Sequence, residues 1–341
     1  MLDIDFYKFD DFYNKQIKPR LFIFEKERKK IIFEFKIARF IFTLPVFVGI
    51  SIYGLLFLIR NFLSDEAAIY LGVILPIFVP FAVMIYAISI YNKALDKKKR
   101  YIKKLKNQVY KVLFNLLGLN YSTSVSPNFA DYQNAILKYF PEKKFISKDK
   151  SVNITLFTYF MKFEDEISGV FKDIPFELCD ATLIKKIEIN KEKPEDSIFQ
   201  GLMLAVKLNK NFNDETIIKT KNFKLFDIKK SIINLEDIEF SKKYNVYNND
   251  QVEGRYLLTT AFMDRLYNFG KTRKDKTIIF FNSTCSEYKN MFILTNTGKD
   301  NFEIPFNKSI LNKKYYYNLL KELVDMLEIA VALKLEKKIN L

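Results

Sequence analysis

The pattern of apolar positions near the start of the chain predicts two long helices that carry no charge. Phe40–Ile59 contains twenty consecutive uncharged residues, and Ala67–Asn92 contains twenty-six. A helix rises about 1.5 Å per residue, so roughly twenty residues cross the ~30 Å hydrocarbon layer of a membrane. Pro45, Pro76 and Pro80 fall inside these stretches, where membrane helices tolerate proline as a kink. We therefore predict transmembrane helices at residues 40–59 and 67–92; the alternative is a pair of buried core helices.

The flanks of the two apolar stretches predict their orientation. Residues 1–39 contain ten Lys and Arg, residues 93–111 contain nine with Asp96 as the only acid, and the connector 60–66 contains Arg60 alone. Basic residues collect on the cytoplasmic side of membrane helices. We therefore expect a tight hairpin with a short extracytoplasmic loop at 60–66 and with both termini in the cytoplasm.

Helical periodicity continues on both sides of the predicted hairpin. After the second stretch, apolar residues recur at spacings of three and four: Ile102, Leu105, Val109, Val112 and Leu116. Before the first stretch, Arg28 interrupts a similar series: Leu21, Phe24, Ile31, Phe35 and Ala38. Such stripes favour helices that pack against each other. We predict a cytoplasmic N-terminal helix in 1–39 and a basic juxtamembrane helix in 93–118. Separate amphipathic helices lying on lipid headgroups are the alternative.

A dense basic tract directly follows the second apolar stretch. Each basic residue near a membrane surface gains roughly 1 kcal/mol from anionic lipids. We expect seven side chains to contact anionic headgroups: Lys97, Lys98, Lys99, Arg100, Lys103, Lys104 and Lys106.

The rest of the chain, residues 119–341, has the pattern of one mixed domain. Helical periodicity predicts helices at Asn128–Tyr139, Leu257–Phe269 and Asn312–Leu335. Runs rich in β-branched and aromatic residues predict strands at Ser168–Phe171, Phe176–Ile189, Gly201–Leu208, Thr216–Thr220, Thr277–Phe281 and Met291–Thr295. Strands and helices are grouped and do not alternate, so we expect a cytoplasmic α+β domain with mostly antiparallel strands.

Composition and charge narrow the functions that this architecture could have. The chain has no His, two Cys and a net charge of +15. Without His, histidine-based catalysis and His-ligated metal sites are excluded, and two thiols are too few for a Cys₄ site. We expect Cys179 and Cys285 to be small buried hydrophobes, because disulfides are rare in the cytoplasm. The positive charge is concentrated next to the apolar stretches, so we do not expect a nucleic-acid partner.

A search for catalytic motifs leaves only carboxylates. The nine glycines form no GxxxxGK[ST], GxGxxG or GxSxG motif. Two acidic groups, Glu164–Glu166 and Glu236–Glu239, could hold Mg²⁺ or Ca²⁺, but neither has the spacing of a known metal loop. We interpret both as solvated loop charges and predict no catalytic, metal or cofactor site.

Three parts of the soluble block resemble DUF3137, a family of uncharacterised bacterial membrane proteins. They are Phe199–Leu202 with Lys210–Phe212 and Thr216–Ile218; Leu235–Phe240 with Tyr244–Tyr247 and Asp250–Thr259; and the late strands with the terminal helix. The paired apolar stretches also fit the layout of the family, whose pattern more often has Ala at the position of Gly254. The resemblance implies architecture, a bacterial inner-membrane location and, as a partner, a LemA-like membrane protein; it implies no activity.

The segment Asp250–Thr259 is the most specific of these motifs. Asp250 is a suitable N-cap, and Glu253 stands in capping-box register with it. Arg255 could pair with Glu253 or with Glu236–Glu239, and Tyr256, Leu257 and Leu258 would enter the core. The alternative is that Asp250, Gln251, Glu253 and Arg255 line a partner or ligand site.

The sequence therefore favours a membrane-anchored, non-enzymatic scaffold, adaptor or sensor. The first alternative is a hydrolase-like enzyme with a carboxylate-based site. The second is a small transporter component that is active only as an oligomer, since neither apolar stretch contains an ionisable residue that could mark a pathway.

Overall fold

The computed structural model describes residues 6–59, 65–140, 156–188, 195–208, 213–223, 228–271, 276–282, 291–304 and 306–334. Most of the predicted connector 60–66, the motif residues Lys210–Phe212 and the thiol of Cys285 lie outside the described residues. The chain divides into two compact units. The sheet unit contains Met1–Asp10, Tyr110–Ile304 and Lys313–Leu341, and the helical unit contains Asp11–Val109 and Pro305–Asn312.

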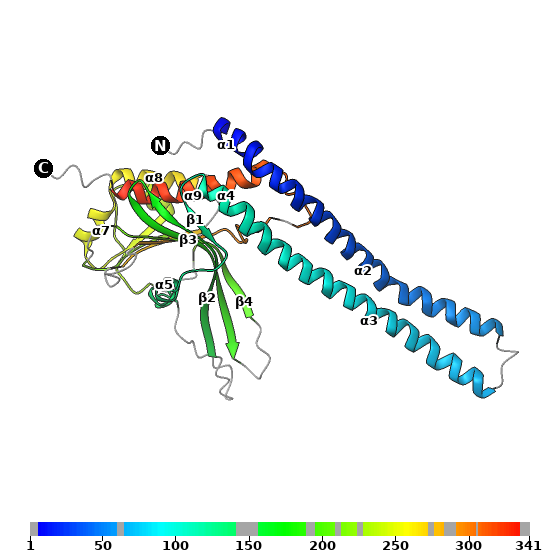
Figure 1. The fold of residues 1–341 in the computed structure, drawn as a ribbon. Coiled ribbons are helices and arrows are strands. Elements are labelled where there is room, and N and C mark those ends of the chain that lie inside the picture. The colour runs from blue at the N-terminus through cyan, green and yellow to red at the C-terminus, as the bar shows by residue number, and fades with distance from the viewer. Residues whose placement is uncertain are drawn as a thin grey trace, which may run out of the picture. The chain divides into compact units, whose positions relative to one another are not determined.

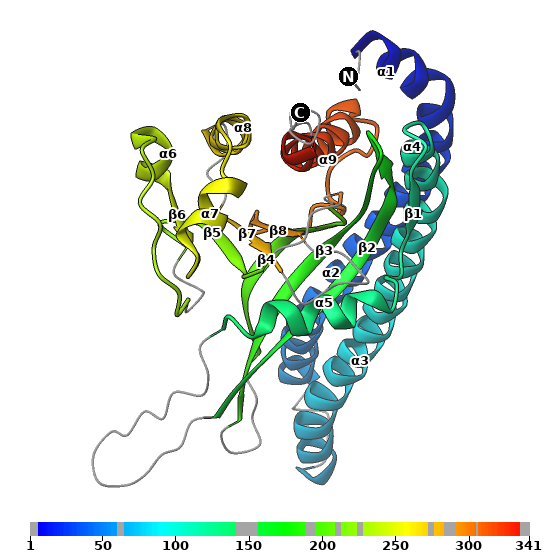
Figure 2. The ribbon, with the colours of Figure 1, turned by 90° about the vertical axis from the view of Figure 1, so that its left-hand side faces the viewer.

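Two long antiparallel helices dominate the helical unit, α2 (Lys18–Ile59) and α3 (Asp65–Leu105), and they run side by side (Figures 1 and 2). Ahead of α2 come α1 (Phe6–Phe12) and a π-helical turn (Tyr13–Ile17). The ring of Phe24 contacts that of Tyr101 at 5.9 Å between centroids, and Phe35 contacts Tyr91 at 5.3 Å. The prediction that both helices extend beyond the apolar stretches and pack together is confirmed.

The burial predicted from the two apolar stripes is more accurate for the first stripe than for the second. In α2 the predicted Leu21, Phe24, Ile31 and Ala38 are all buried. In the second stripe, Leu105 and Val109 are buried as predicted, but Leu116 is exposed, and the buried residues just before it are Leu113 and Phe114. The cause is a second π-helical turn, Lys106–Tyr110. A π turn inserts an extra residue and rotates every later side chain around the helix axis.

A buried ion pair occupies the interruption in the first stripe. The Arg28 guanidinium donates to both oxygens of Glu25, at 2.9 and 2.6 Å, and its Nη1 donates to the carbonyl of Phe306 at 2.8 Å. The amide of Ile310 donates to Glu25 Oε2 at 3.2 Å. Burial favours a raised pKa for Glu25, but these donors outweigh it and hold the pKa below its usual value. The pair therefore binds the backbone of residues 306–310 to α2.

One helical stretch among the described residues, Phe78–Asn115, is long and apolar enough to cross a membrane, and 11% of its most apolar window is buried inside the protein. Length and composition alone are weak evidence for a membrane span. The predicted two-span hairpin is thus not established by this criterion and stays a prediction.

The sheet unit is built on eight described strands that all pair antiparallel, in the order β1-β2-β3-β4-β8-β7-β5-β6. Their bounds are β1 Asn120–Ser122, β2 Leu156–Phe171, β3 Ile174–Glu188, β4 Glu195–Val206, β5 Thr216–Thr220, β6 Tyr244–Tyr247, β7 Lys276–Phe281 and β8 Met291–Asn296. The helices of this unit are α4 Lys111–Asn115, α5 Asn128–Leu137, α6 Ile238–Lys243, α7 Gln251–Leu257, α8 Thr260–Lys271 and α9 Lys313–Lys334. The predicted α+β class with antiparallel strands is confirmed.

Helices cover both faces of the sheet: α5 lies on one side, and α8 and α9 lie on the other (Figures 1 and 2). Cys179, which alternates with its neighbours along β3, faces α5 in a core that includes Phe129 and Tyr132. Cys179 is therefore the buried hydrophobe that we expected. On the opposite face the ring of Phe281 contacts Phe262 of α8 at 6.2 Å between centroids.

Strand β2 is much longer than the predicted Ser168–Phe171. The charged residues Lys162 and Glu164–Glu166 in the middle of the strand interrupt its pattern, and the pairing with β3 shifts between Glu164 and Ile167. Asp165 lies in this bulge with a φ of 57°. A bulge redirects side chains, and here it turns Asp165 into the protein: the expectation that Glu164–Glu166 is solvated is wrong for Asp165 and Glu166, which are buried.

Candidate functional site

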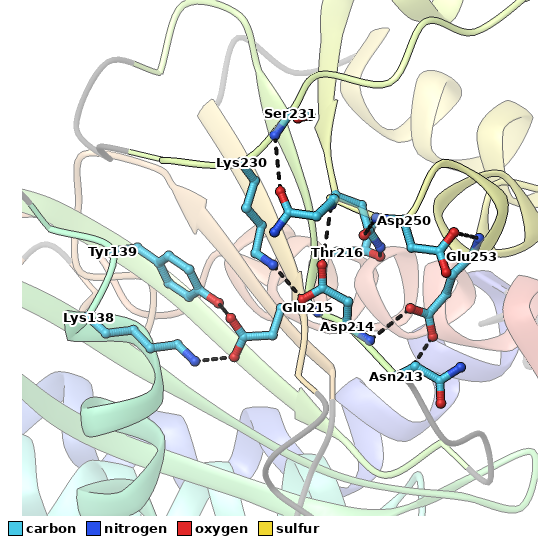
Figure 3. Close-up of polar contacts among 12 residues, drawn as sticks. Lys138, Tyr139, Asn213, Asp214, Glu215, Thr216, Lys230, Ser231, Asp250 and Glu253 are labelled. Carbon is cyan, nitrogen blue, oxygen red and sulfur yellow. Dashed lines mark hydrogen bonds and ion pairs between the residues drawn. The ribbon is translucent and has the colours of Figure 1, made fainter.

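The predicted N-cap at Asp250 is confirmed. Helix α7 begins at Gln251, and Asp250 is extended, with φ −92° and ψ 107°. Its Oδ1 accepts the amide of Val252 at 2.8 Å. It also accepts the amide of Glu253 at 3.1 Å (Figure 3). These bonds satisfy backbone donors that the first helical turn leaves unpaired.

Glu253 does not complete the predicted capping box. The amide of Asp250 donates to Asn248 Oδ1 at 2.6 Å, and the carboxylate of Glu253 accepts the amides of Asn213 and Asp214 at 2.6 and 2.8 Å (Figure 3). Glu253 thus ties the start of α7 to the segment that enters β5. No local spacing indicates this contact, because the partners are about forty positions away.

Asp214 extends this network. Its Oδ1 accepts Lys230 Nζ at 2.6 Å, and its Oδ2 accepts the amide of Asn249 at 3.3 Å. Burial favours a raised pKa, but Lys230 and the amide donors outweigh it, so the pKa of Asp214 lies below its usual value. The next residue, Glu215, binds Lys138 and Tyr139, so this short segment fastens α5 as well as α7.

The remaining motif residues lie on the surface. Gln251 and Arg255 are exposed, and Arg255 donates to the carbonyl of Asn234 at 3.4 Å in place of the predicted carboxylates. Leu257 and Leu258 enter the core as predicted. Tyr256 does not: its side chain is 61% exposed, and that of Val252, one turn earlier, is 78% exposed. The acidic side chains of the motif hold the fold, whereas its exposed surface includes large apolar groups.

The second acidic group that we singled out has an ordinary structural role. Asp237 caps α6 by accepting the amide of Phe240 at 2.9 Å. Glu239 is at the surface and pairs with Lys242 at 2.6 Å. The prediction of solvated charge is confirmed for Glu239.

The residues expected at lipid headgroups have several environments within the helical unit. Lys97 binds Glu34 of α2 at 2.7 Å, Lys98 lies 5.3 Å from the ring centroid of Phe306, and Lys106 is buried. The others are exposed: Lys99, Arg100, Lys103 and Lys104. We therefore remove Lys106 from the set proposed to contact lipid, because a buried ammonium group does not reach a headgroup.

A carboxylate cluster that the sequence did not reveal lies at the edge of the sheet unit core. Asp165 of β2, Asp180 of β3 and Asp300 in the loop after β8 each place a carboxylate oxygen within 4.8 Å of the others. Asp165 is 2% exposed and Asp180 is 7% exposed. Like charges at this separation in a buried place repel each other strongly. A proton or a divalent cation held between the carboxylates would relieve this repulsion.

The protein itself supplies hydrogen-bond donors to this cluster. Both oxygens of Asp180 accept bonds, from the side chain of Asn301 at 2.9 Å and from the amide of Phe302 at 3.1 Å. Tyr121 donates its hydroxyl to Asp165. The pKa of Asp180 is raised to about 8, and burial is the largest cause. The hydrogen bond with Asp300 and the negative charge of Asp300 raise the pKa further. At neutral pH the cluster therefore holds a proton, and the amide donors occupy lone pairs that a cation would need.

These features define an antiparallel α+β domain around an eight-stranded sheet, together with a second unit of paired long helices. Residues 197–335 match the family described as protein of unknown function (DUF3137). The predicted resemblance is confirmed over this stretch, which contains the segment Asp250–Thr259 and the terminal helix; the match does not include the long helices.

Among solved structures, the chain is similar to the crystal structure of the mycobacterial trehalose monomycolate transport factor A, TtfA. The similarity covers 64% of this chain and 92% of that chain, at 9% sequence identity and a TM-score of 0.31. A TM-score this low carries no argument about function. No curated protein matches the chain.

Proposed function

We propose that α2 and α3 cross a membrane as a hairpin and that the chain acts there as a scaffold or adaptor without catalytic activity. The observation that carries this proposal is the exposure of large apolar side chains along both helices. On α2 they include Phe40, Phe42, Val46, Phe47, Ile50, Tyr53, Leu55, Phe57 and Leu58, and on α3 Phe78, Val79, Phe81, Ile85, Tyr86, Ile88 and Tyr91. A continuous apolar surface of this kind is rare in soluble monomers and suits lipid.

Charge supports one orientation of the proposed hairpin. The predicted spans contain no charged residue, and basic residues are concentrated at the ends opposite the short connector. By the positive-inside rule, both termini and the sheet unit face the cytoplasm of a bacterial inner membrane. Of the residues predicted to contact anionic headgroups, Lys97–Arg100 then lie nearest the membrane, whereas Lys103 lies roughly 17 Å beyond Asn92 along the helix.

The surroundings of the residues in the segment Asp250–Thr259 support the proposed adaptor role. Asp250 and Glu253 are engaged in capping α7 and fastening a loop, so their structural role is sufficient. The exposed Tyr256 is of a residue type that is enriched at protein-binding surfaces, and Val252 adds an exposed apolar side chain one turn away. A LemA-like membrane protein, which the family resemblance implies as partner, is part of this proposal.

A carboxylate-based enzyme is the second candidate. The observation in its favour is the raised pKa of Asp180 beside Asp165 and Asp300, because a carboxyl that keeps its proton near neutral pH can act as a general acid. The burial of Asp165 and Asp180 argues against it, because a substrate needs access to them. We therefore prefer the adaptor.

Thiol labelling in intact cells tests the membrane part of the proposal. Ser64→Cys is introduced into a chain that also carries Cys179→Ala and Cys285→Ala. An impermeant maleimide should label this thiol from outside, whereas the matched variant Ser124→Cys, on the exposed surface of the sheet unit, should be labelled only after lysis. Labelling of Ser124→Cys alone from outside would reverse the orientation. Recovery of the chain in the soluble fraction would contradict the membrane hairpin itself.

Affinity purification of the intact chain from membranes tests the adaptor part. A scaffold should retain a specific protein, and Val252→Ser with Tyr256→Ser should release it if the motif surface takes part. Retention that is unaffected by this pair of changes would exclude the motif surface as the binding site.

A further inference from the structure

The part of α2 between Lys18 and Arg39 has two different faces. One face is buried and includes Leu21, Phe24 and Ile31. The opposite face, which we call the outer face of α2, carries Phe22, Lys26, Lys29, Phe33, Lys36 and Ile37, all of them exposed. Positions four, seven and eleven residues apart lie on the same side of a helix. Phe22, Lys26, Phe33 and Ile37 therefore form one stripe.

The apolar members of this stripe are unusual for a face in water. Phe22 is 55% exposed and Phe33 is 62% exposed. They lie on the part of the helix before the first predicted span, so lipid tails do not explain them. A solvated helix face is normally polar, and single exposed apolar residues are common, but a stripe with helical spacing is typical of a helix-binding surface.

The same surface is basic. Residues 18–39 contain eight Lys and Arg and three Glu, a net charge of +5, and three of these lysines lie on the outer face of α2. Lys26, Lys29 and Lys36 are exposed, and within the described part of the chain no ion pair includes them. These lysines lie within the roughly 15–20 residues of a span end that set its orientation. A topology signal therefore explains their charge, but it does not explain the exposed Phe22 and Phe33 beside them.

Lipid headgroups account for only part of this charge. The argument rests on the proposed membrane hairpin, which places Phe40 at the start of the first span. At about 1.5 Å per residue, Lys36 lies roughly 6 Å from Phe40 along the axis, whereas Lys26 and Phe22 lie roughly 21 and 27 Å away. Attraction to an anionic surface falls off within about 8 Å at physiological ionic strength. The far half of the outer face is beyond this reach.

We propose that the outer face of α2 docks an acidic amphipathic helix of a partner protein. The stripe supplies apolar contacts at helical spacing, and the lysines beside it supply charges opposite to those of the partner. A second copy of this chain would bring the same positive face and be repelled. A nucleic acid would use the lysines but gain little from Phe22, Phe33 and Ile37, since backbone contacts are electrostatic.

A defined peptide tests the proposal with the full-length chain in nanodiscs of zwitterionic lipid. The probe is a fluorescent synthetic helix of about three heptads, with Leu on one face and Glu beside it. We expect saturable binding in fluorescence anisotropy, weakened at least about tenfold by Phe22→Ser with Phe33→Ser. The matched control is Val170→Ser with Ile238→Ser, which removes exposed apolar groups from the sheet unit and should leave this binding unchanged.

Three further probes separate the alternatives. The same peptide with Gln in place of Glu should bind at least about tenfold more weakly, because it lacks the opposite charge. A polyglutamate of equal charge and a single-stranded oligonucleotide should also bind more weakly. The proposal is overturned if polyglutamate or the oligonucleotide binds as tightly as the acidic helix, or if the Phe22 and Phe33 changes have no effect. A chain that is labelled at Ser64→Cys from outside but does not bind the peptide contradicts the docking surface and not the membrane hairpin.

Discussion

Gly254 packs so closely on Ile233 that a Cβ added at Gly254 would lie 2.0 Å from Cδ1 of Ile233. Ile233 is buried beneath α7, and Asn248 bounds the same space, 3.4 Å from the added atom. The Ala that the family pattern more often has at this position therefore requires a different neighbour. The departure from the family pattern at Gly254 is thus coupled to the packing of Ile233.

Gly254→Ala should lower the free energy of unfolding by up to about 2 kcal/mol, because the ~1 kcal/mol that Ala gains over Gly in a helix offsets part of the cost of moving Ile233. Ile233→Val removes Cδ1 and should restore most of this loss in the double variant. The measurement is the unfolding transition of the full-length chain by circular dichroism in a double-mutant cycle. Strict additivity of the two changes would show that the residues do not compete for space.

Asp250→Ala should cost about 1 kcal/mol of stability, because two amides of the first turn of α7 lose their acceptor. Asp250→Asn keeps a side-chain oxygen and should lose much less. Both are measured by thermal unfolding. If Asp250→Ala left the melting temperature unchanged but abolished retention of a partner, the cap would not account for the residue.

Stability should fall as pH rises from about 4 to about 8. The folded pKa of Asp180, about 8, lies above its unfolded value of 3.8, so the folded chain binds more protons in this range. Each pH unit can cost up to about 1.4 kcal/mol, and the loss ends above the folded pKa. Unfolding midpoints between pH 5 and 9 measure the effect.

Two variants control this pH experiment. Asp300→Asn removes one cause of the raised pKa and should flatten the dependence, and Asp180→Asn should abolish it. An equal slope in Asp180→Asn would contradict the assignment. Stabilisation by millimolar Mg²⁺ or Ca²⁺ that disappears in Asp180→Asn would show that the cluster holds a cation in place of a proton.

Glu25→Gln should lower the stability of the full-length chain by about 3–5 kcal/mol, because it leaves the buried guanidinium of Arg28 without its charge partner. Glu25→Gln with Arg28→Met should be less damaging than Glu25→Gln alone. The matched control is Asp11→Asn, which breaks the exposed pair with Lys15 and should change stability by less than about 1 kcal/mol. Equal effects of the buried and exposed changes would contradict the importance of burial.

Sequence patterns predicted the features that depend on neighbours along the chain. The strand Thr216–Thr220 has the predicted bounds, the terminal helix begins at Lys313, one residue after the predicted start, and Asp250 caps the predicted turn. In each case the information lies within a few residues: alternation for a strand, spacing of three and four for a helix, and an acidic side chain just before it.

Features that depend on distant segments escaped prediction. Asp180 stands in an otherwise apolar stretch of strand, and this alone could have marked it as unusual. Its partners Asp165 and Asp300 come from other parts of the chain, so the sequence did not reveal the cluster. A π-helical turn, which no residue pattern announced, changed which side of the helix after α3 is buried and placed Lys106 inside. Glu253 does not form the predicted capping box, because its carboxylate accepts the loop amides of Asn213 and Asp214.

The segment Pro305–Asn312 belongs to the helical unit although it follows the sheet strands in the chain. Its backbone is bound by Glu25 and Arg28, and Ile310 is buried. Replacement of the long helices by one recombination upstream of Tyr110 would therefore leave this segment without the two residues that bind its backbone. Glu25, Arg28 and residues 305–312 should be inherited together, and chimeras that separate them should fail to accumulate in cells.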